Sequence, residues 1–312
     1  MNQEKKGLNT ICTHVGEVED KQFRGAVSPL YMSSSYAFQD VDVKRYPRYF
    51  NTPNQEGLAK KIAALEHCES GLIFGSGMAA ISTAVMAFLK AGDHIVLQGD
   101  IYGGTYNLFK VAFKRLGVEC RFTAGENGSD YERLIDKNTK AIYLETISNP
   151  RFSVADFGAI AAVAKAHDIP LIVDNTFGAC GYLFRPLDHG ANIVVQSATK
   201  WIGGHGTSIG GVIVDGGNYN WENGKYPQFS EPSEGYHGLN FGEVFGMNGP
   251  FGNIAFIIRC RVEGLRDFGP ALSPFNAFML IQGLETLSLR VQKHVDNALE
   301  LAEWLESHDQ VA

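Results

Sequence analysis

Short apolar runs alternate with segments of helical spacing along the middle of the chain. The runs are rich in Val and Ile and predict strands at "DHIVLQG", "VECRF", "KAIYLET", "IPLIVDN", "ANIVVQS" and "GGVIVDGG". Apolar residues at helical spacing predict helices at "MAAISTAVMAFLKAG", "TYNLFKVAFKRLG" and "DFGAIAAVAKAHD". Because most of the runs are continuous rather than alternating, we expect strands that are covered on both faces. The pattern therefore predicts an α/β fold with a mostly parallel sheet flanked by helices.

Three regions follow from this pattern. Residues 1–44 predict an irregular N-terminal arm, and residues 45–245 predict the α/β domain. Within it, residues 216–246 are glycine-rich, aromatic and polar, and we expect a substrate or interface loop there because so long a connection is usually functional. Residues 246–312 predict a loop and helices that lead into an incomplete C-terminal domain.

Composition narrows the possible functions. The chain has 312 residues, of which 45% are hydrophobic, and its 27 basic and 34 acidic residues give a formal net charge of -7. Without a basic surface, nucleic acid is not an expected partner. No apolar stretch has the length of a membrane span and the N-terminus lacks the pattern of a signal peptide, so we expect a cytoplasmic protein. Five widely spaced cysteines without a C-x-x-C pair predict reduced thiols rather than disulfides or a zinc site.

Polar residues follow two neighbouring apolar runs. In open α/β sheets ligands bind beyond the carboxyl ends of the strands, where "IPLIVDNTF" places Asp174 and "NIVVQSATK" places Ser197, Thr199 and Lys200. A lysine can form a Schiff base with an aldehyde, hydroxyls can hold a phosphate, and an acid can pair with a ring nitrogen. Taken singly, Lys200 reads as a solvated loop lysine and Asp174 as a turn residue. Together they predict a site for pyridoxal phosphate.

A third motif predicts an anion site. "FGSGMAAIS" places Ser76, Gly77 and Met78 directly before a predicted helix, where free N–H groups and the helix dipole favour a phosphate. The motif is not G-x-G-x-x-G, and no strand is predicted before it. A dinucleotide site is therefore a poor match.

Six motifs in this order carry a resemblance to a known family: "YPRYFNTPN", "GSGMAA", "IYGGTYNLF", "ETISNP", "IVDNTF" and "SATKWIGGHG". Over essentially its whole length, the chain resembles the Cys/Met-metabolism family of pyridoxal-phosphate enzymes, which have the aspartate-aminotransferase type fold (fold type I). The resemblance implies that Lys200 carries the cofactor. It also implies that Asp174 pairs with the pyridine nitrogen and that Tyr102 stacks on the ring.

The resemblance implies further contacts. Asn149 would lie near the ring hydroxyl and the substrate carboxylate. Tyr46 and Arg48 would reach the phosphate of a neighbouring subunit's cofactor, which implies a homodimer or homotetramer with shared active sites. No metal is expected, and His205 is interpreted as structural. The residues expected around the phosphate are Ser76, Gly77, Met78, Ser197 and Thr199.

Within the family, "SATKWIGGHGTSIGGVIVDGG" and "LSPFNAFMLIQGLETLSLR" are similar to the O-acetylhomoserine sulfhydrylase branch. This branch implies a transferase of methionine biosynthesis and trans-sulfuration, acting on an amino-acid substrate with sulfide or a thiol. The implied reaction is γ-replacement on O-acetyl-L-homoserine with sulfide, giving homocysteine and acetate, with Lys200 moving protons and Tyr102 assisting the leaving group. Met78 departs from the branch, which more often has glutamine there. Methionine is found in methionine and cystathionine γ-lyases and in cystathionine γ-synthases, which remain alternatives.

A second departure lies at the C-terminal end. Family members continue into a further domain that supplies an arginine for the substrate carboxylate, a bidentate contact that only a guanidinium group offers. None of the arginines in this sequence lies in that motif. We therefore expect a fragment or a shortened form. The remaining alternative is a catalytically poor fragment that acts only in assembly.

Overall fold

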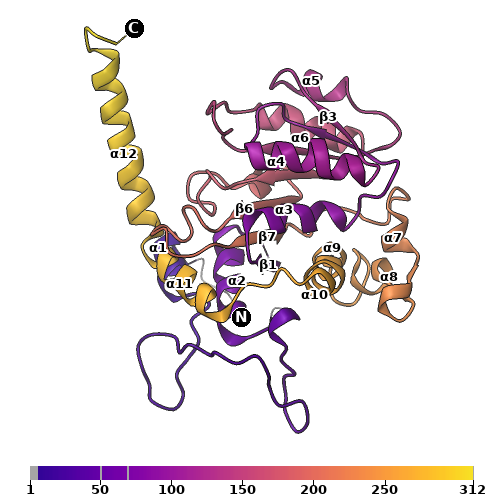
Figure 1. The fold of residues 1–312 in the computed structure, drawn as a ribbon, viewed down its shortest axis with the longest axis vertical. Coiled ribbons are helices and arrows are strands. Elements are labelled where there is room, and N and C mark those ends of the chain that lie inside the picture. Colours follow the sequence, from indigo (N-terminus) through magenta and orange to yellow (C-terminus); the bar gives the residue numbers. More distant parts are fainter. Residues whose placement is uncertain (1–5, 50, 69, 312) are drawn as a thin grey trace.

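A seven-stranded sheet forms the centre of the computed structural model, which describes residues 6–49, 51–68 and 70–311 (Figure 1). The pairs β2–β3, β2–β4, β4–β5 and β5–β6 are parallel, and β7 is antiparallel to both β6 and β1. The predicted mostly parallel sheet is therefore confirmed. In spatial order the strands are β1 (Ser70–Phe74), β7 (Gly211–Asp215), β6 (Ile193–Ser197), β5 (Leu171–Asp174), β4 (Thr139–Glu145), β2 (His94–Leu97) and β3 (Glu119–Phe122).

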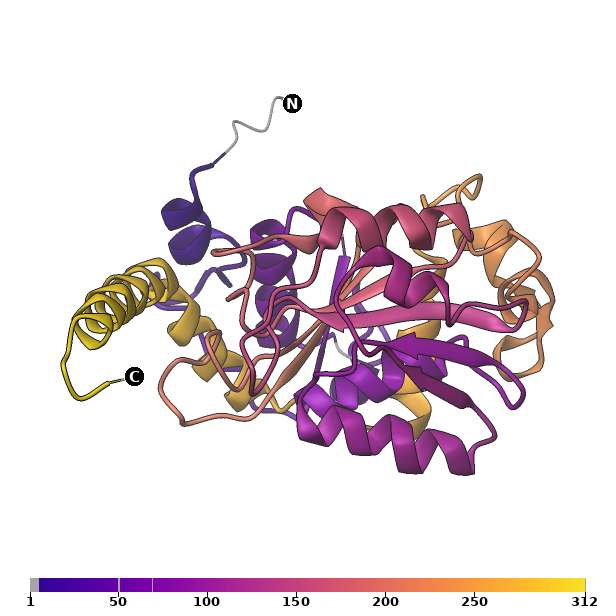
Figure 2. The same ribbon diagram turned by 90° about the horizontal axis from the view of Figure 1, so that it is seen from above.

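Helices cover both faces of the sheet, and this explains the continuous apolar runs (Figure 2). Val96 and Ile142 belong to the core on one face, whereas Ile95 and Tyr143 belong to the core on the other. Successive residues of a strand point to opposite faces, so every position must be apolar when both faces are covered. The first core includes α5 (Gly128–Glu132) and α6 (Phe157–Ala166); the second includes α3 (Gly77–Met86), α4 (Gly103–Asn107) and the π-helical η2 (Leu108–Phe113).

One strand was not predicted. β1 lies directly before the "GSGM" motif and pairs antiparallel with β7, with Phe74 opposite Gly211. Only its last three residues are buried, which is too short an apolar run to stand out in the sequence. The expectation that no strand precedes Ser76 is therefore wrong. β1 also runs in the same direction as β6, because both are antiparallel to β7.

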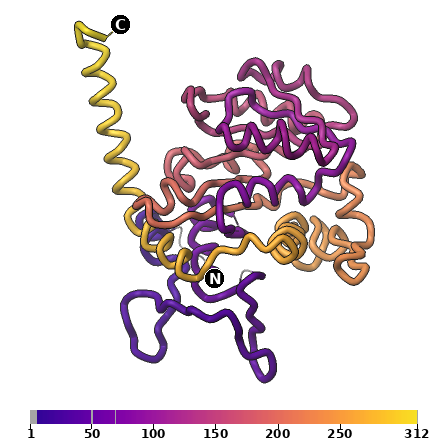
Figure 3. The backbone as a smooth tube through the Cα atoms, viewed as in Figure 1, coloured from indigo at the N-terminus to yellow at the C-terminus, as the bar shows by residue number. Residues whose placement is uncertain are grey.

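The helices of residues 246–312 form two regions. The first consists of α9 (Ala255–Arg259), the π-helical η5 (Cys260–Leu265) and α10 (Arg266–Phe268). The second is not continuous, because α11 (Pro274–Glu285) and α12 (Leu287–Glu306) are separated at Thr286. α12 projects away from the body of the molecule (Figure 3). Among the described residues, none of the helices combines the length and the hydropathy that crossing a lipid bilayer would require.

The N-terminal region contains two helices that the sequence pattern did not indicate. α1 (Leu8–His14) packs against α2 (Pro53–Leu65), and α2 also contacts α11 and β1. Lys61 lies within α2, and its buried Nζ donates to Thr13 O at 3.1 Å and to Cys12 O. Between the two helices, residues 15–46 have no regular element and run over the surface before the short 3-10 turn η1 (Pro47–Tyr49).

The glycine-rich segment 216–246 is folded and lies away from the predicted site. Its Tyr219 Oη donates to Asp168 O at 2.8 Å and its Tyr226 Oη donates to Lys140 O at 2.7 Å. Both acceptors lie near the amino ends of the parallel strands β5 and β4, whereas the predicted site lies at the carboxyl ends. In this chain these tyrosines therefore do not line the predicted strand-end site, and a substrate or interface role of the segment stays a prediction. The aromatic residues form a second packed layer instead, in which Trp221 stacks on Phe256 with ring centroids 5.0 Å apart.

This segment includes several short elements. They are α7 (Pro227–Ser230), β8 (Pro232–Ser233), η4 (Glu234–Tyr236), β9 (Leu239–Asn240) and α8 (Phe241–Phe245), with β8 and β9 forming an antiparallel pair. The remaining short helix of the α/β region is η3 (Pro186–His189), between β5 and β6.

Candidate functional site

The residues expected from separate motifs meet at one edge of the sheet. Ser76 follows β1, Tyr102 follows β2, Asn149 follows β4, Asp174 ends β5 and Lys200 follows β6. These strands all run in the same direction, so their carboxyl ends lie along the same edge. Open α/β sheets bind ligands at this edge.

The N-terminus of α3 forms a cradle with the end of β6. Ser76 caps this helix, and its Oγ accepts from Ala79 N at 3.1 Å. The N–H groups of Gly77 and Met78 lie in the first turn, where a helix offers no acceptor of its own. A Cβ atom on Gly77 would lie 2.8 Å from Ser197 Cβ, so only glycine lets the helix approach the strand this closely. The cradle suits an anion such as phosphate.

Thr199 ties the end of β6 to the start of β7. Its Oγ1 accepts from Gly210 N at 3.1 Å and donates to Gly210 O at 3.3 Å. Ser197 is held from the other side, because its backbone N donates to Thr176 Oγ1 at 2.8 Å. The two hydroxyl residues of the "SATK" motif therefore stand on a rigid turn.

Asp174 is a buried acid with both oxygens held in place. Oδ1 accepts from Thr176 N at 3.0 Å and from Thr176 Oγ1 at 2.5 Å, and Oδ2 accepts from Tyr143 Oη at 3.3 Å. Burial raises the pKa of the Asp174 carboxyl above its ordinary value, and the Thr176 hydrogen bonds partly oppose this. A carboxylate in this position is favourable only when a positive group compensates its loss of solvation.

Lys200 is exposed at the start of a glycine-rich turn. Its backbone N donates to Ser197 O at 3.2 Å, and its carbonyl accepts from Gly204 N at 2.8 Å. Gly204 has a φ of +69°, and a Cβ atom there would lie 2.3 Å from the guanidinium carbon of Arg290. Glycine at this position therefore lets Arg290 pack under the turn that presents Lys200.

Glu145 belongs to the same edge and was missed by the sequence analysis. Its Oε1 accepts from Tyr102 N at 2.7 Å, and its Oε2 accepts from Asn149 N at 3.1 Å. Burial, followed by the negative charge of Asp174, raises the pKa of Glu145 to about 8. An acid that ends a buried strand is the signal that identified Asp174, and Glu145 carries it in the "ETISNP" motif.

A second buried acid lies beneath this edge. Glu66 is fully buried, and its Oε1 accepts from Asn175 Nδ2 at 3.3 Å and from Gln196 Nε2. Asn175 and Gln196 adjoin Asp174 and Ser197 in the sequence, so Glu66 supports the fold below the site. Burial raises the pKa of Glu66 to about 7.

This raised pKa predicts a pH dependence of stability. Folded Glu66 holds its proton up to about pH 7, whereas the unfolded carboxyl releases it near its ordinary pKa of 4.5. Folding stability from this group is therefore full below pH 4.5 and is lost as the pH rises through 7. This rise in pH should lower the free energy of unfolding of the parent chain by about 3 kcal/mol. Glu66→Gln keeps the accepting oxygen but has no carboxyl proton to release, so we expect no such decrease in the variant. Urea unfolding at acidic and neutral pH measures this, and equal pH slopes in both proteins would contradict it.

Tyr46 and Arg48 stand apart from the other predicted site residues. Both are exposed at η1, where Arg48 Nη2 donates to Tyr46 Oη at 3.2 Å and Arg48 Nη1 donates to Arg266 O at 2.6 Å. Within the described part of the chain, their side-chain hydrogen bonds join them to each other and to Arg266 O rather than to the strand ends. The structure therefore does not bring them together with Lys200 in one chain.

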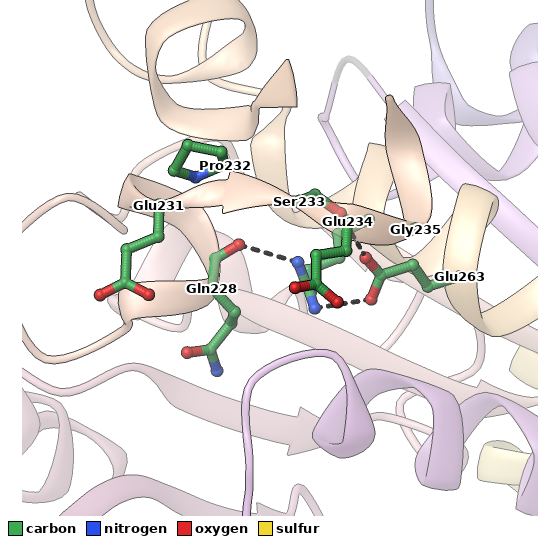
Figure 4. A pocket seen from close by; sticks show the side chains of 8 residues that line it. Gln228, Glu231, Pro232, Ser233, Glu234, Gly235 and Glu263 are labelled. Atoms are coloured by element: carbon green, nitrogen blue, oxygen red, sulfur yellow. Dashed lines mark hydrogen bonds and ion pairs between the residues drawn. The ribbon is translucent and has the colours of Figure 1, made fainter. Parts of the chain in front are cut away.

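Two surface cavities lie elsewhere. The one in Figure 4 has a volume of about 240 Å³ and is lined by residues of the segment around Gln228 and Glu234, together with Arg259 and Glu263. Arg259, one of the lining residues, donates to Gln228 O at 2.8 Å and pairs with Glu263 at 2.6 Å. A second cavity of about 300 Å³ lies between α3 and α10. Of the predicted site residues, none lines either cavity.

Possible metal ligands include His205, which the sequence analysis interpreted as structural. Across residues 6–49, 51–68 and 70–311, no three His, Cys, Asp or Glu side chains gather as metal ligands. His205 Nδ1 lies 2.8 Å from Gly203 O, within its own turn.

Comparison with known proteins places this geometry in a family. Homocysteine/cysteine synthase of Saccharomyces cerevisiae is 46% identical over 319 residues, which cover 98% of this chain and 70% of that protein. O-acetyl-L-homoserine sulfhydrylase of Leptospira meyeri is 44% identical over 315 residues, covering 97% of this chain and 71% of that protein.

A solved structure described as an O-acetylhomoserine (thiol)-lyase from Campylobacter jejuni superimposes with a TM-score of 0.90 at 33% identity. The superposition covers 97% of this chain and 76% of the solved chain, and the solved structure contains a pyridoxyl-lysine phosphate. The fold type expected from the motifs is therefore confirmed. The family model for Cys/Met metabolism PLP-dependent enzymes matches residues 9–312. The chain belongs to the Cys/Met metabolism family of enzymes that depend on pyridoxal phosphate.

Proposed function

We propose that the chain catalyses γ-replacement on O-acetyl-L-homoserine with sulfide, giving homocysteine and acetate. In this reaction the bond from Cγ to the acetate oxygen breaks and a bond from Cγ to sulfur forms. The observation that carries the proposal is the convergence of Lys200, Asp174 and the α3 cradle on one sheet edge. Relatives named homocysteine/cysteine synthase and O-acetyl-L-homoserine sulfhydrylase, which match nearly the whole chain, support the choice of reaction.

The residues at this edge fit pyridoxal phosphate. The cofactor has a phosphate, a ring nitrogen that can carry a proton and an aldehyde. The α3 cradle suits the phosphate, and the buried Asp174 carboxylate requires a positive partner, which the protonated ring nitrogen provides. The exposed Lys200 amine suits the aldehyde. When bound, the cofactor supplies an electron sink that stabilises negative charge at the substrate Cα.

Each predicted site residue has a proposed role. With the cofactor bound, Tyr102 would cover one face of the ring, and Asn149 would lie near the ring hydroxyl and the substrate carboxylate. Lys200 accepts the proton from the substrate Cα and then moves a proton at Cβ, and Tyr102 Oη assists departure of acetate. Asp174 keeps the ring nitrogen protonated. The phosphate is held by Ser76, Gly77, Met78, Ser197 and Thr199.

The test is product formation by the purified chain supplied with pyridoxal phosphate, O-acetyl-L-homoserine and sulfide. We expect homocysteine and acetate in equal amounts, with no product when the cofactor is omitted. Acetate release without homocysteine, while sulfide is in excess, would count against replacement. Failure to form either product with the cofactor bound would favour the alternative of a catalytically poor fragment that acts in assembly.

Met78 supports a second candidate reaction. It lies in the first turn of α3, at the proposed phosphate site, and it is the residue expected of methionine and cystathionine γ-lyases and of cystathionine γ-synthases. Under this alternative, the chain would release 2-oxobutyrate from methionine or cystathionine. The similarity of the relatives favours replacement over elimination.

We also propose that sites are shared between subunits of a homodimer or homotetramer. Tyr46 is 47% exposed, yet Arg48 is already held by Arg266 O, so the pair is fixed in position without contacting its own chain's site. This is the arrangement expected if the pair completes a neighbour's phosphate site. A cytoplasmic location is proposed because all five cysteines are free thiols, as in a reducing compartment.

The shared site predicts complementation between two inactive variants. Arg48→Ala should weaken retention of the cofactor, because a charged contact to the neighbour's phosphate is lost. Coexpression with Lys200→Ala subunits should restore activity, since one site of a hybrid receives Arg48 and Lys200 from different chains. Activity of the purified hybrid measures this. A fully active monomer would contradict the shared site.

A further inference from the structure

Glu145 joins the two loops that carry Tyr102 and Asn149, and we propose that it is a positioning residue for both. Because Tyr102 and Asn149 face the cofactor only in the proposed function, the inference rests on that function. Glu145 ends β4 and is 4% exposed. Both of its carboxylate oxygens are engaged by backbone N–H groups of the two loops, so its effect passes through the loops.

The geometry assigns one oxygen of Glu145 to each loop. Oε1 accepts from Tyr102 N at 2.7 Å, and Oε2 accepts from Asn149 N at 3.1 Å. Glu145 is itself fixed, because its backbone N donates to Gln98 Oε1 at 2.9 Å. A carboxylate is the side-chain group that can accept from two backbone N–H groups through two equivalent oxygens. Hydrogen bonds to a charged acceptor are also the stronger ones.

A second carboxylate makes the reciprocal link. Asp100 follows β2, and its Oδ2 accepts from Ser148 Oγ at 2.7 Å and from Ser153 Oγ at 3.2 Å on the loop after β4. Glu145 thus holds the loop after β2 from β4, while Asp100 holds the loop after β4 from β2. Two adjacent strands are cross-linked in both directions at the edge where the site lies.

Glu145 holds the backbone of Tyr102, and the first turn of α4 supports its ring. Tyr102 is the N-cap of α4 and has no side-chain cap of its own, so its backbone position depends on the Glu145 contact. A Cβ atom on Gly104 would lie 2.5 Å from Cε1 of the Tyr102 ring. The ring therefore rests on the first turn of α4, with 49% of Tyr102 exposed at the site edge.

The charges around Glu145 support this role. Burial, and then the negative charges of Asp174 and Asp100, raise the pKa of its carboxyl. Acceptance of two N–H groups requires the ionised form, which a positive group next to Asp174 would favour. Binding of a protonated cofactor ring would therefore strengthen the link between the loops.

Glu145→Gln tests the proposal because glutamine has the same shape but only one accepting oxygen. One of the two N–H groups must then face an amide donor, and its loop is released. In the cofactor-free chain, at a pH above 8 where the Glu145 carboxyl is ionised, we expect faster hydrogen exchange in peptides covering residues 99–106 or 146–152. In the loaded chain, we expect about a tenfold higher Kd for pyridoxal phosphate and a weaker visible circular dichroism of the cofactor. Glu66→Gln is the matched control, since both contacts of Glu66 use one oxygen.

The outcomes separate this inference from the proposed function. Unchanged hydrogen exchange in both peptides of Glu145→Gln would overturn the inference. Lower stability in urea with normal cofactor affinity and normal dichroism would also overturn it, because a residue with a purely structural role gives that combination. If the unmodified chain binds the cofactor but forms no homocysteine, the proposed function fails and the Glu145 comparison still stands. If the unmodified chain binds no cofactor, exchange in the cofactor-free protein decides the matter.

Discussion

Lys200→Ala should abolish covalent fixation of pyridoxal phosphate by borohydride and lower turnover by roughly a thousandfold or more. The unmodified chain should be yellow when loaded, and reduction should place the cofactor on Lys200 alone. The reason is that Lys200 is the lysine on the turn after β6, at the edge shared by Asp174 and the α3 cradle. Peptide mapping by mass spectrometry after reduction measures this.

Lys114→Ala is the control, because Lys114 is an exposed lysine at the end of the helical segment after α4. It should keep the colour, the labelled peptide and the activity. A label on another lysine of the unmodified chain would contradict the assignment of Lys200.

Asp174→Asn should lower turnover by about a hundredfold to a thousandfold, while the protein still folds and binds the cofactor. The substitution removes the negative charge but keeps an oxygen for Thr176 N and Thr176 Oγ1. Without the charge, the ring nitrogen loses the partner that keeps it protonated, and the electron sink at Cα weakens. Steady-state kinetics with the loaded enzyme measures the decrease.

Stability distinguishes this effect from a folding defect. Because burial already disfavours the charged carboxyl of Asp174, we expect the cofactor-free Asn variant to be at least as resistant to urea as the parent chain. Near-normal turnover in Asp174→Asn would show that another acid pairs with the ring. Glu145 would then be the next acid to test.

The fold was predictable wherever the apolar runs were long. β2 and β4 to β7 are buried on both faces, so their Val and Ile runs stand out from the polar background. β1 was missed because only three of its residues are buried and it gains its place by pairing with β7. α2 was missed because its buried face includes Asn54, Gln55 and Lys61, whose partners lie in distant segments. Such contacts leave no local pattern in the sequence.

The site residues that lie within single sequence motifs were predictable. Lys200, Asp174 and Ser76 each adjoin a strand end, and the parallel sheet brings them to one edge. Glu145 ends a buried strand as Asp174 does, so the same signal could have found it. The contacts of Glu66 with Asn175 and Gln196 join distant segments and leave no linear motif. Aromatic residues of the segment 216–246 suggested a substrate or interface loop, but Trp221 and Phe229 are buried in a packed layer.

Partition between replacement and elimination tests the central claim most directly. The chain loaded with pyridoxal phosphate is given O-acetyl-L-homoserine with sulfide in excess, and homocysteine and 2-oxobutyrate are measured in the same sample. Parallel samples contain methionine or cystathionine without sulfide. We predict that homocysteine is the main product and forms faster than 2-oxobutyrate does in the parallel samples. Mainly 2-oxobutyrate in the presence of excess sulfide would contradict the account and would identify the chain as the lyase that Met78 suggests.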